Sequence, residues 1–173
     1  MIKLNPKTVS ALSLIGLALV LVGCVGNVDM TVDFYRGGNW EATMELTVSR
    51  EAVAMGGGVG EIEAELDNLV AEASREGVRA SWDEGKGNGN LVYVVDMKGN
   101  SLDSLSHTLL EDAEITVEER NGQRLIHFSY YPGGLGFESQ TLTLRGGEII
   151  AGNGQRVDDQ TMTWKDSYYE IEA

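Results

Sequence analysis

The first regular pattern in the chain is an alternation of apolar and polar side chains. It occupies residues 28–35 and resumes over residues 40–48, after the turn Arg36-Gly37-Gly38-Asn39. A period of two is typical of a strand with one buried face, and a glycine-rich turn between two such runs favours antiparallel pairing. These residues therefore predict a β-hairpin.

The spacing changes to that of a helix over residues 59–76. Apolar side chains recur on one face, acidic side chains fill much of the rest, and Gly77 follows where a C-cap belongs. The glycine run at 56–60 has Glu61 where a G-x-G-x-x-G motif needs glycine, and it lacks the lysine of a phosphate loop. We interpret the run as a turn that leads into an amphipathic helix.

A second hairpin and a short helix are predicted next. Residues 78–83 and 91–97 flank a glycine-rich turn and read as paired strands. Asn100-Ser101 then offers an N-cap for a short helix over residues 102–110 that carries four leucines.

The third hairpin has the most specific signal because Asn121-Gly122 is the preferred two-residue type I′ turn. Such a turn fixes the register of the flanking strands, and a slip of one residue would reverse their faces. Counting outward from the turn predicts four pairs on one face, Glu119 with Arg124, Val117 with Ile126, Ile115 with Phe128, and Ala113 with Tyr130.

The last segment predicts strands at 140–144, 148–151 and 160–165, after a glycine-rich loop. The order hairpin, helix, hairpin, helix, hairpin, strands is typical of the α+β class. We expect one domain over residues 28–166 and a tail over 167–173. Its sheet should be antiparallel, built from successive β-hairpins, with two helices packed on one side.

Charge excludes one class of partner. Acidic residues outnumber basic ones 27 to 13 in the 173 residues, and the net charge is −14. A chain this acidic, with no basic stripe, is repelled by phosphate backbones, so we expect no nucleic-acid binding. Anionic lipid head groups would repel it too unless something holds it at the membrane.

The amino terminus predicts export. Residues 1–7 carry two lysines and no acid, and residues 8–22 are uncharged and mostly apolar. A cationic segment before about 15 apolar residues is typical of a secretory signal, whereas a membrane span needs about 20. An uncleaved membrane anchor is the alternative interpretation.

Leu21-Val22-Gly23-Cys24 resembles the bacterial lipobox, and Cys24 is the only cysteine in the chain. The resemblance implies that residues 1–23 are a cleaved signal peptide recognised through Leu21, Val22 and Gly23. Cys24 then carries a diacylglycerol through a thioether, and residues 24–27 form a short lipidated tether. The implied location is the extracytoplasmic face of the cell membrane. A buried or unpaired structural cysteine is the alternative.

A second resemblance covers most of residues 24–166. The stretch Leu144–Gly154, followed by Thr161-Met162-Thr163-Trp164, is similar to the close of the LppM-type lipoprotein domain family, although Gly146-Gly147 stands where that family often has Pro-Gly. The resemblance implies an extracytoplasmic α+β domain that binds membrane lipids or glycolipids and has no catalytic activity.

The residues offer little for catalysis, a metal or a cofactor. Cys24 is assigned to the lipid, His127 lies on the polar face of the third hairpin opposite Thr116, and His107 has no second histidine or cysteine nearby in sequence. The acid pairs Asp83-Glu84 and Asp158-Asp159 lack the spacing of a calcium loop. We therefore expect a non-enzymatic protein with no metal and no cofactor.

Leu135 and Phe137 are the candidate ligand contacts because they project from a glycine-rich loop. An apolar loop on a tethered domain could insert into lipid or cover a lipid pocket, or the two residues could close the edge of the sheet. The leading function is binding of a membrane lipid, glycolipid or other amphiphile. The alternatives are a structural or assembly lipoprotein that recruits another envelope protein and, third, an envelope hydrolase.

Overall fold

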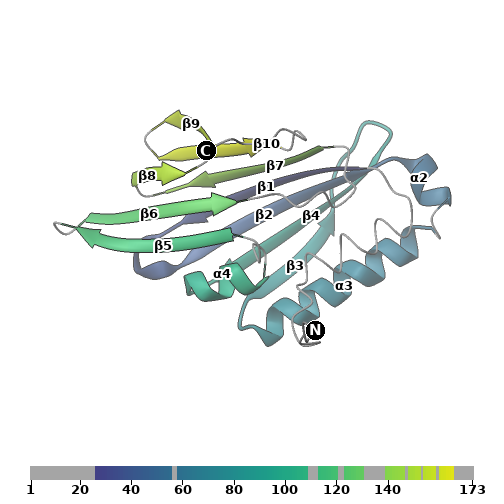
Figure 1. Ribbon diagram of the computed structural model, residues 1–173. Coiled ribbons are helices and arrows are strands. Elements are labelled where there is room, and N and C mark those ends of the chain that lie inside the picture. The colour runs from purple at the N-terminus through teal and green to yellow at the C-terminus, as the bar shows by residue number, and fades with distance from the viewer. Residues whose placement is uncertain are drawn as a thin grey trace, which may run out of the picture.

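The computed structural model describes residues 26–55, 58–108, 113–120, 123–130, 139–146, 148–152, 154–158 and 160–165. In these ranges seven strands form one sheet in the order β3-β4-β2-β1-β7-β10-β9, and three form a second sheet in the order β5-β6-β8. Among the described helices, α3 is the one substantial helix, with 17 residues (Figure 1). Helices α2 and α4 have 6 and 7 residues.

The elements follow one another along the chain with these bounds: β1 Gly26–Phe34, η1 Arg36–Gly38, β2 Trp40–Val48, α2 Arg50–Met55, α3 Val59–Arg75, β3 Arg79–Glu84, β4 Leu91–Gly99, α4 Leu102–Thr108, β5 Ala113–Arg120, β6 Gln123–Tyr130, β7 Ser139–Arg145, β8 Glu148–Gly152, β9 Gln155–Asp158 and β10 Thr161–Lys165. The predicted α+β class is confirmed. Helix α2 and strand β9 were not expected, since each is short and carries no clear periodic pattern.

The prediction of a purely antiparallel sheet is wrong. Strand β1 pairs with β2 antiparallel but with β7 parallel, from Asn27 opposite Ser139 to Asp33 opposite Arg145. Strands β6 and β8 are also parallel, in the second sheet. The alternation of a strand buried on one face is the same in both kinds of pairing, so the pattern identified the strands without their directions.

Alternate residues of the central strands form the core. On β1 and β2 the buried positions are Val28, Met30, Val32, Phe34, Trp40, Ala42, Met44, Leu46 and Val48, and the residues between them are half-buried or exposed. Leu142, Leu144 and Met162 continue this buried face across β7 and β10.

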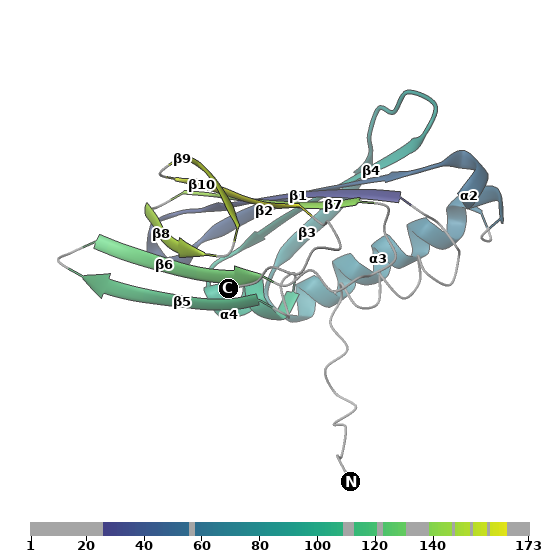
Figure 2. The ribbon, with the colours of Figure 1, turned by 45° about the horizontal axis from the view of Figure 1, so that its top comes forward.

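Helix α3 covers part of the buried face. It contributes Ile62, Leu66, Leu69 and Ala73 to the core and lies on the same side of the seven-stranded sheet as α4 and the three-stranded sheet (Figure 2). Its end is a Schellman motif: Val78 N donates to Ala73 O at 2.9 Å and Gly77 N to Ser74 O at 3.2 Å, with Gly77 at φ 77°. Ala73 and Val78 are both buried, so the cap also closes the core.

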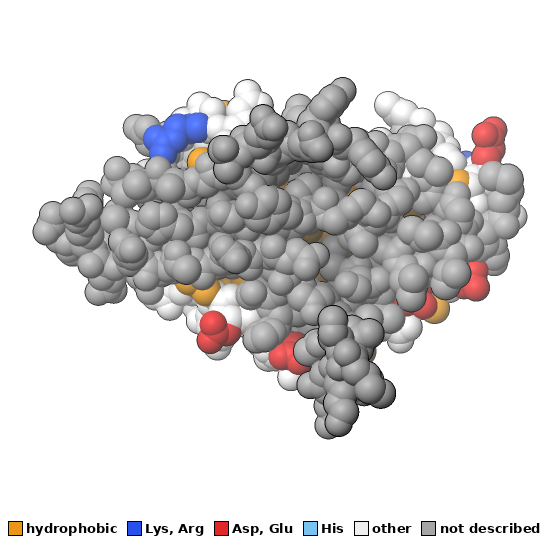
Figure 3. Space-filling view, in the orientation of Figure 1, with side chains coloured by type: hydrophobic (Ala, Val, Ile, Leu, Met, Phe, Trp, Pro, Cys, Tyr) orange, Lys and Arg blue, Asp and Glu red, His pale blue; other side chains and the backbone are white. Residues whose placement is uncertain are grey.

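The opposite face of the sheet is polar. Thr43, Thr31, Thr143 and Thr163 are successive cross-strand partners over β2, β1, β7 and β10, and none of the four is buried. Facing threonines stabilise a sheet through paired hydroxyl and methyl groups. On the face that Figure 3 shows, the acidic side chains of the described residues lie at separate points.

The register predicted for the third hairpin is confirmed. Cα partners in β5 and β6 include Glu119 with Arg124, Val117 with Ile126, Ile115 with Phe128 and Ala113 with Tyr130. The turn residues 121 and 122 lie outside the described residues. The two-residue separation in sequence was therefore sufficient to set the pairing.

Replacing Tyr93 with Phe is expected to raise the free energy of unfolding by about 1 kcal/mol. Tyr93 is 1% exposed, packs edge-on against Trp82, and its hydroxyl has no hydrogen-bond partner in the described part of the chain. Denaturant unfolding measures the change. Tyr35→Phe is the matched control, since Tyr35 is exposed, and it should change stability by less than about 0.5 kcal/mol. A marked loss in Tyr93→Phe would show that the hydroxyl has a partner.

Candidate functional site

The residues predicted to carry the anchor and the lipid contact, Leu21, Val22, Gly23, Cys24, Leu135 and Phe137, lie outside the described residues. Their neighbours in sequence are described. Strand β1 begins at Gly26, two residues after Cys24, and β7 begins at Ser139, two residues after Phe137. Asn27 and Ser139 are Cα partners, so the chain enters the sheet at the same end in both places.

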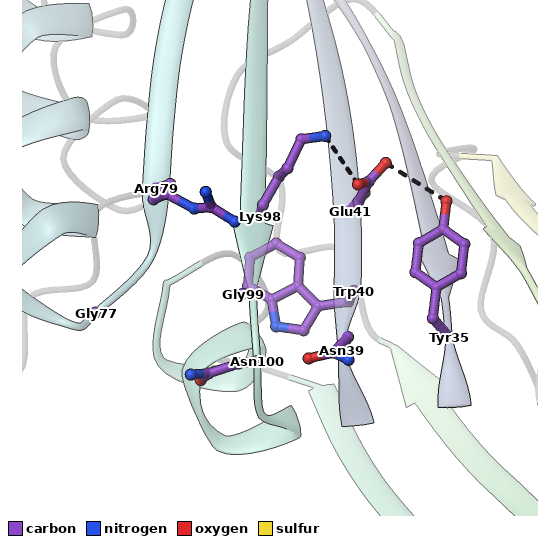
Figure 4. A pocket seen from close by; sticks show the side chains of 9 residues that line it. All are labelled: Tyr35, Asn39, Trp40, Glu41, Gly77, Arg79, Lys98, Gly99 and Asn100. Atoms are coloured by element: carbon purple, nitrogen blue, oxygen red, sulfur yellow. Dashed lines mark hydrogen bonds and ion pairs between the residues drawn. The ribbon is translucent and has the colours of Figure 1, made fainter. Parts of the chain in front are cut away.

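A pocket of about 460 Å³ lies at the other end of the sheet (Figure 4). That end is where β1 finishes, β2 and β3 begin and β4 finishes, because Phe34 is paired with Trp40, and Trp40 with Gly99. The lining residues come from three separate parts of the sequence: Tyr35, Asn39, Trp40 and Glu41; Gly77 and Arg79; and Lys98, Gly99 and Asn100.

Trp40 is one of the lining residues and holds α4 to the sheet. Its indole Nε1 donates to the carbonyl oxygen of Ser101 at 2.9 Å and to Ser104 Oγ at 3.2 Å. Ser101 is the N-cap of α4, since Ser101 Oγ accepts from Ser104 N at 3.1 Å. The indole ring lies directly over Gly99, and a Cβ at Gly99 would overlap it. Glycine at 99 therefore makes room for the tryptophan.

Charged side chains form a row along the polar face beside the pocket. Arg79 is the cross-strand partner of Lys98, Lys98 of Glu41, Glu41 of Asp33, and Asp33 of Arg145. Lys98 Nζ lies 2.8 Å from Glu41 Oε1, and Arg145 Nε lies 3.5 Å from Asp33 Oδ1. The two adjacent carboxylates are thus each paired with a cation on their outer side, which offsets their mutual repulsion.

The pairing shifts the pKa values of its members. The hydrogen bond with Glu41 raises the pKa of Lys98, and the same bond lowers the pKa of Glu41. Tyr35 donates its hydroxyl to Glu41 Oε2 at 3.4 Å. Partial desolvation, together with the nearby charges of Glu41 and Asp33, raises the pKa of Tyr35. All three groups keep their ordinary charge at neutral pH.

A second hollow of about 400 Å³ lies at the same end of the sheet, lined by Arg145, Gly146, Asp158, Gln160 and Thr161. Gly146 has φ 95° and its Cα lies against the backbone of Phe34, so a side chain there would be both strained and blocked. The hollow continues from Arg145 across Thr161 of β10 to Asp158 of β9, and Arg145 is the one cation among its described lining residues.

The described pocket is suited to binding. Its lining offers two cations, one paired carboxylate, amides and a phenol, and it brings no nucleophile together with a free base. Among the described residues there is no group of three or more His, Cys, Asp or Glu that could hold a metal ion. His127 is the Cα partner of Thr116, as predicted, and His107 lies in α4.

Sequence reasoning did not identify this pocket. Its residues meet only because β4 lies between β3 and β2, and that strand order is not encoded in the alternation of any one strand. The predicted strand 91–97 stopped two residues before Gly99, whereas β4 extends to Gly99. Glycine within a strand often marks a close approach by another group, so Gly99 was the one available signal.

The comparisons with known proteins give one structural match. No protein-family model matches the chain, and no curated protein sequence matches it significantly. The fold is similar to the NMR structure of the folded domain of the LppM protein of Mycobacterium tuberculosis, with a TM-score of 0.51 and 10% sequence identity. The match covers 82% of this chain and 81% of that chain. The resemblance drawn from the sequence is therefore confirmed at the level of the fold.

No described helix is both long and apolar enough to cross a membrane.

Replacing Gly99 with Ala is expected to lower the free energy of unfolding by about 1–3 kcal/mol, because the new Cβ would overlap the indole of Trp40. The displaced ring should also lose its bonds to Ser101 and Ser104. Gly60→Ala in α3 is the matched control, since a Cβ there meets nothing within 4 Å and a helical alanine is favoured over glycine. Equal unfolding midpoints for the two variants would contradict the close approach.

The Glu41–Lys98 pair predicts how stability depends on pH. The Glu41 pKa lies below 4.5 and the Lys98 pKa above 10.5. The pair therefore makes its full contribution to stability at pH values between the ordinary pKa values of the two groups, 4.5 and 10.5. Its contribution is lost as pH falls through the lowered pKa of Glu41, or rises through the raised pKa of Lys98. NMR titration of the Glu41 carboxyl should give a value that returns toward 4.5 in Lys98→Met and does not move in Lys86→Met. An unchanged value in Lys98→Met would mean that the pair does not persist in solution.

Proposed function

We propose that this chain is a lipid-anchored, extracytoplasmic, non-enzymatic domain that binds a membrane lipid, glycolipid or other amphiphile at the cell envelope. Acylated Cys24 would hold it on the extracytoplasmic face of the cell membrane, and Leu135 and Phe137 would contact lipid. The observation that supports the proposal is the start of the sheet at Gly26, two positions after Cys24, the residue that we propose is acylated.

The tether is short. Only Val25 lies between Cys24 and Gly26, the first residue of β1, and a step of two positions spans at most about 7 Å. A domain attached this closely cannot move far from the bilayer, so the end of the sheet at Gly26 and Val48 would lie against the lipid head groups. Two or three acyl chains at Cys24 would outweigh the repulsion of an acidic domain from anionic lipids.

The candidate contact residues are tied to that same end. Phe137 lies two residues before Ser139 and Leu135 lies four before it, while Ser139 is the partner of Asn27. Covalent geometry therefore keeps both apolar side chains within about 14 Å of the sheet end that carries the anchor. This placement supports contact with lipid more than a role at the far edge of the sheet.

A structural or assembly role is the second candidate. The edge strand β9 is exposed at every residue, and Val157 is 63% exposed. An uncovered edge strand with an exposed valine can accept a strand from another envelope protein. This alternative would place the partner on β9, whereas lipid binding would place it at the Gly26 end.

The double variant Leu135→Ser/Phe137→Ser tests the proposed lipid contact. It should leave the melting temperature nearly unchanged and should weaken binding to liposomes by about 30-fold or more, since two apolar side chains each contribute about 1–2 kcal/mol when buried in lipid. Flotation of the full chain with liposomes measures the binding. Mass spectrometry of lipid that co-purifies with the chain identifies the ligand.

Val157→Ser is the control, because it removes an exposed apolar side chain from β9. It should bind liposomes like the parent chain. A large drop in melting temperature in the double variant would assign Leu135 and Phe137 to the core. The absence of co-purified lipid after exposure to membrane extract would count against the proposed function.

A further inference from the structure

We propose that the pocket bounded by Arg79 and Lys98 is an oxyanion-binding site that takes a phosphate or carboxylate group on a small polar molecule. This site is separate from the lipid contact proposed above and lies at the opposite end of the sheet.

The first argument is the placement of two cations on adjacent strands. Arg79 and Lys98 are Cα partners in β3 and β4, so their side chains leave the sheet on the same face. Like charges that face each other across a strand pair destabilise the sheet. An oxyanion held between them would remove that repulsion.

The second argument is the net charge of the lining. Lys98 is paired with Glu41 at 2.8 Å, whereas Arg79 acts on Glu41 only through its electrostatic field, which helps to lower the pKa of that carboxyl. With two cations and one carboxylate, the described lining carries a net positive charge in a chain whose net charge is −14. A guanidinium presents a fork of N–H donors that matches the oxygens of carboxylate and phosphate groups.

The third argument is the surrounding geometry. Arg79 extends toward β4, Lys98 extends toward Glu41, and both line the pocket together with Trp40 (Figure 4). The nearby end of α3 does not oppose an anion strongly, because its Schellman motif already engages the carbonyl oxygens of Ala73 and Ser74. A volume of about 460 Å³ exceeds what a bare oxyanion fills, so the group should belong to a small molecule that also contacts Tyr35 and Asn100.

The distance of the pocket from the proposed anchor limits where its ligand comes from. Strand β1 runs its nine residues from Gly26 to the pocket end, a length of roughly 27 Å at about 3.3 Å per residue. Charges on the anchoring membrane are screened over about 8 Å in physiological salt. If Cys24 is the anchor, as proposed above, the ligand reaches this pocket from the aqueous phase or from a second surface. The oxyanion site itself does not depend on the anchor.

Calorimetric titration of the full chain in a neutral detergent tests the proposal, with glucose 6-phosphate, glucuronate and glucose as probes. The two anionic sugars should bind and glucose should not. Arg79→Gln should weaken binding about tenfold or more, as expected for the loss of a charge-assisted hydrogen bond. Arg79→Lys should retain part of the affinity because it keeps the charge.

Lys86→Gln is the control, since Lys86 also carries one positive charge but lies in the loop at the opposite end of β4. It should bind the anionic sugars like the parent chain. Equal binding of glucose and its anionic derivatives, no binding of any probe, or equal loss in Arg79→Gln and Lys86→Gln would overturn the proposal.

A vesicle experiment separates the two sources of the oxyanion. The full chain, anchored in phosphatidylcholine vesicles, is mixed with phosphatidylglycerol vesicles. Bridging that is lost in Arg79→Gln would assign the oxyanion to a lipid head group on a second surface. Binding of the anionic sugars without bridging would assign it to a soluble ligand. Either result supports the oxyanion site, and neither depends on Leu135 or Phe137.

Discussion

The pairing of β1 on both of its edges is the constraint on which the rest of the structure depends. Its nine residues join β2 on one side and β7 on the other, so β1 links the β3-β4-β2 half of the sheet to the β7-β10-β9 half. Four of its side chains lie in the core, from Val28 to Phe34. The same strand begins two residues after Cys24 and ends beside the pocket. One element thus contributes to the core, starts close to Cys24 in the sequence and sets the distance between that end of the sheet and the pocket.

The sequence predicted the local elements well and their long-range arrangement poorly. Alternation predicted β1 and β2, helical spacing predicted α3, and the Asn121-Gly122 dipeptide predicted the register of β5 and β6. Each of these predictions was possible because its signal lies in a short stretch of sequence. The parallel pairing of β1 with β7 could not be predicted, since a strand buried on one face has the same pattern in either direction. The separation of β5, β6 and β8 into a second sheet was also beyond a local signal.

The pocket shows the same limit in chemical terms. Arg79, Lys98 and Glu41 are ordinary surface charges when read one at a time, and only the strand order β3-β4-β2 places them side by side. The domain therefore has two ends of different character. One end holds Gly26 and Ser139, which follow Cys24 and Phe137 by two positions in the sequence, and the other end holds charged and polar groups near Trp40. A tethered binding protein that works between a membrane and the space beyond it would need both.

The parallel pairing of β1 with β7 also governs the order in which the chain can fold. Synthesis delivers β1 and β2 early, and these two strands are adjacent and can pair at once. The other edge of β1 stays open until Ser139–Arg145 has been made, after both hairpins of the middle of the chain. Contacts between such distant segments form slowly, and an open apolar strand edge is prone to pairing with other chains. The residues that complete the sheet are therefore also those that end the period in which the nascent chain is exposed to aggregation.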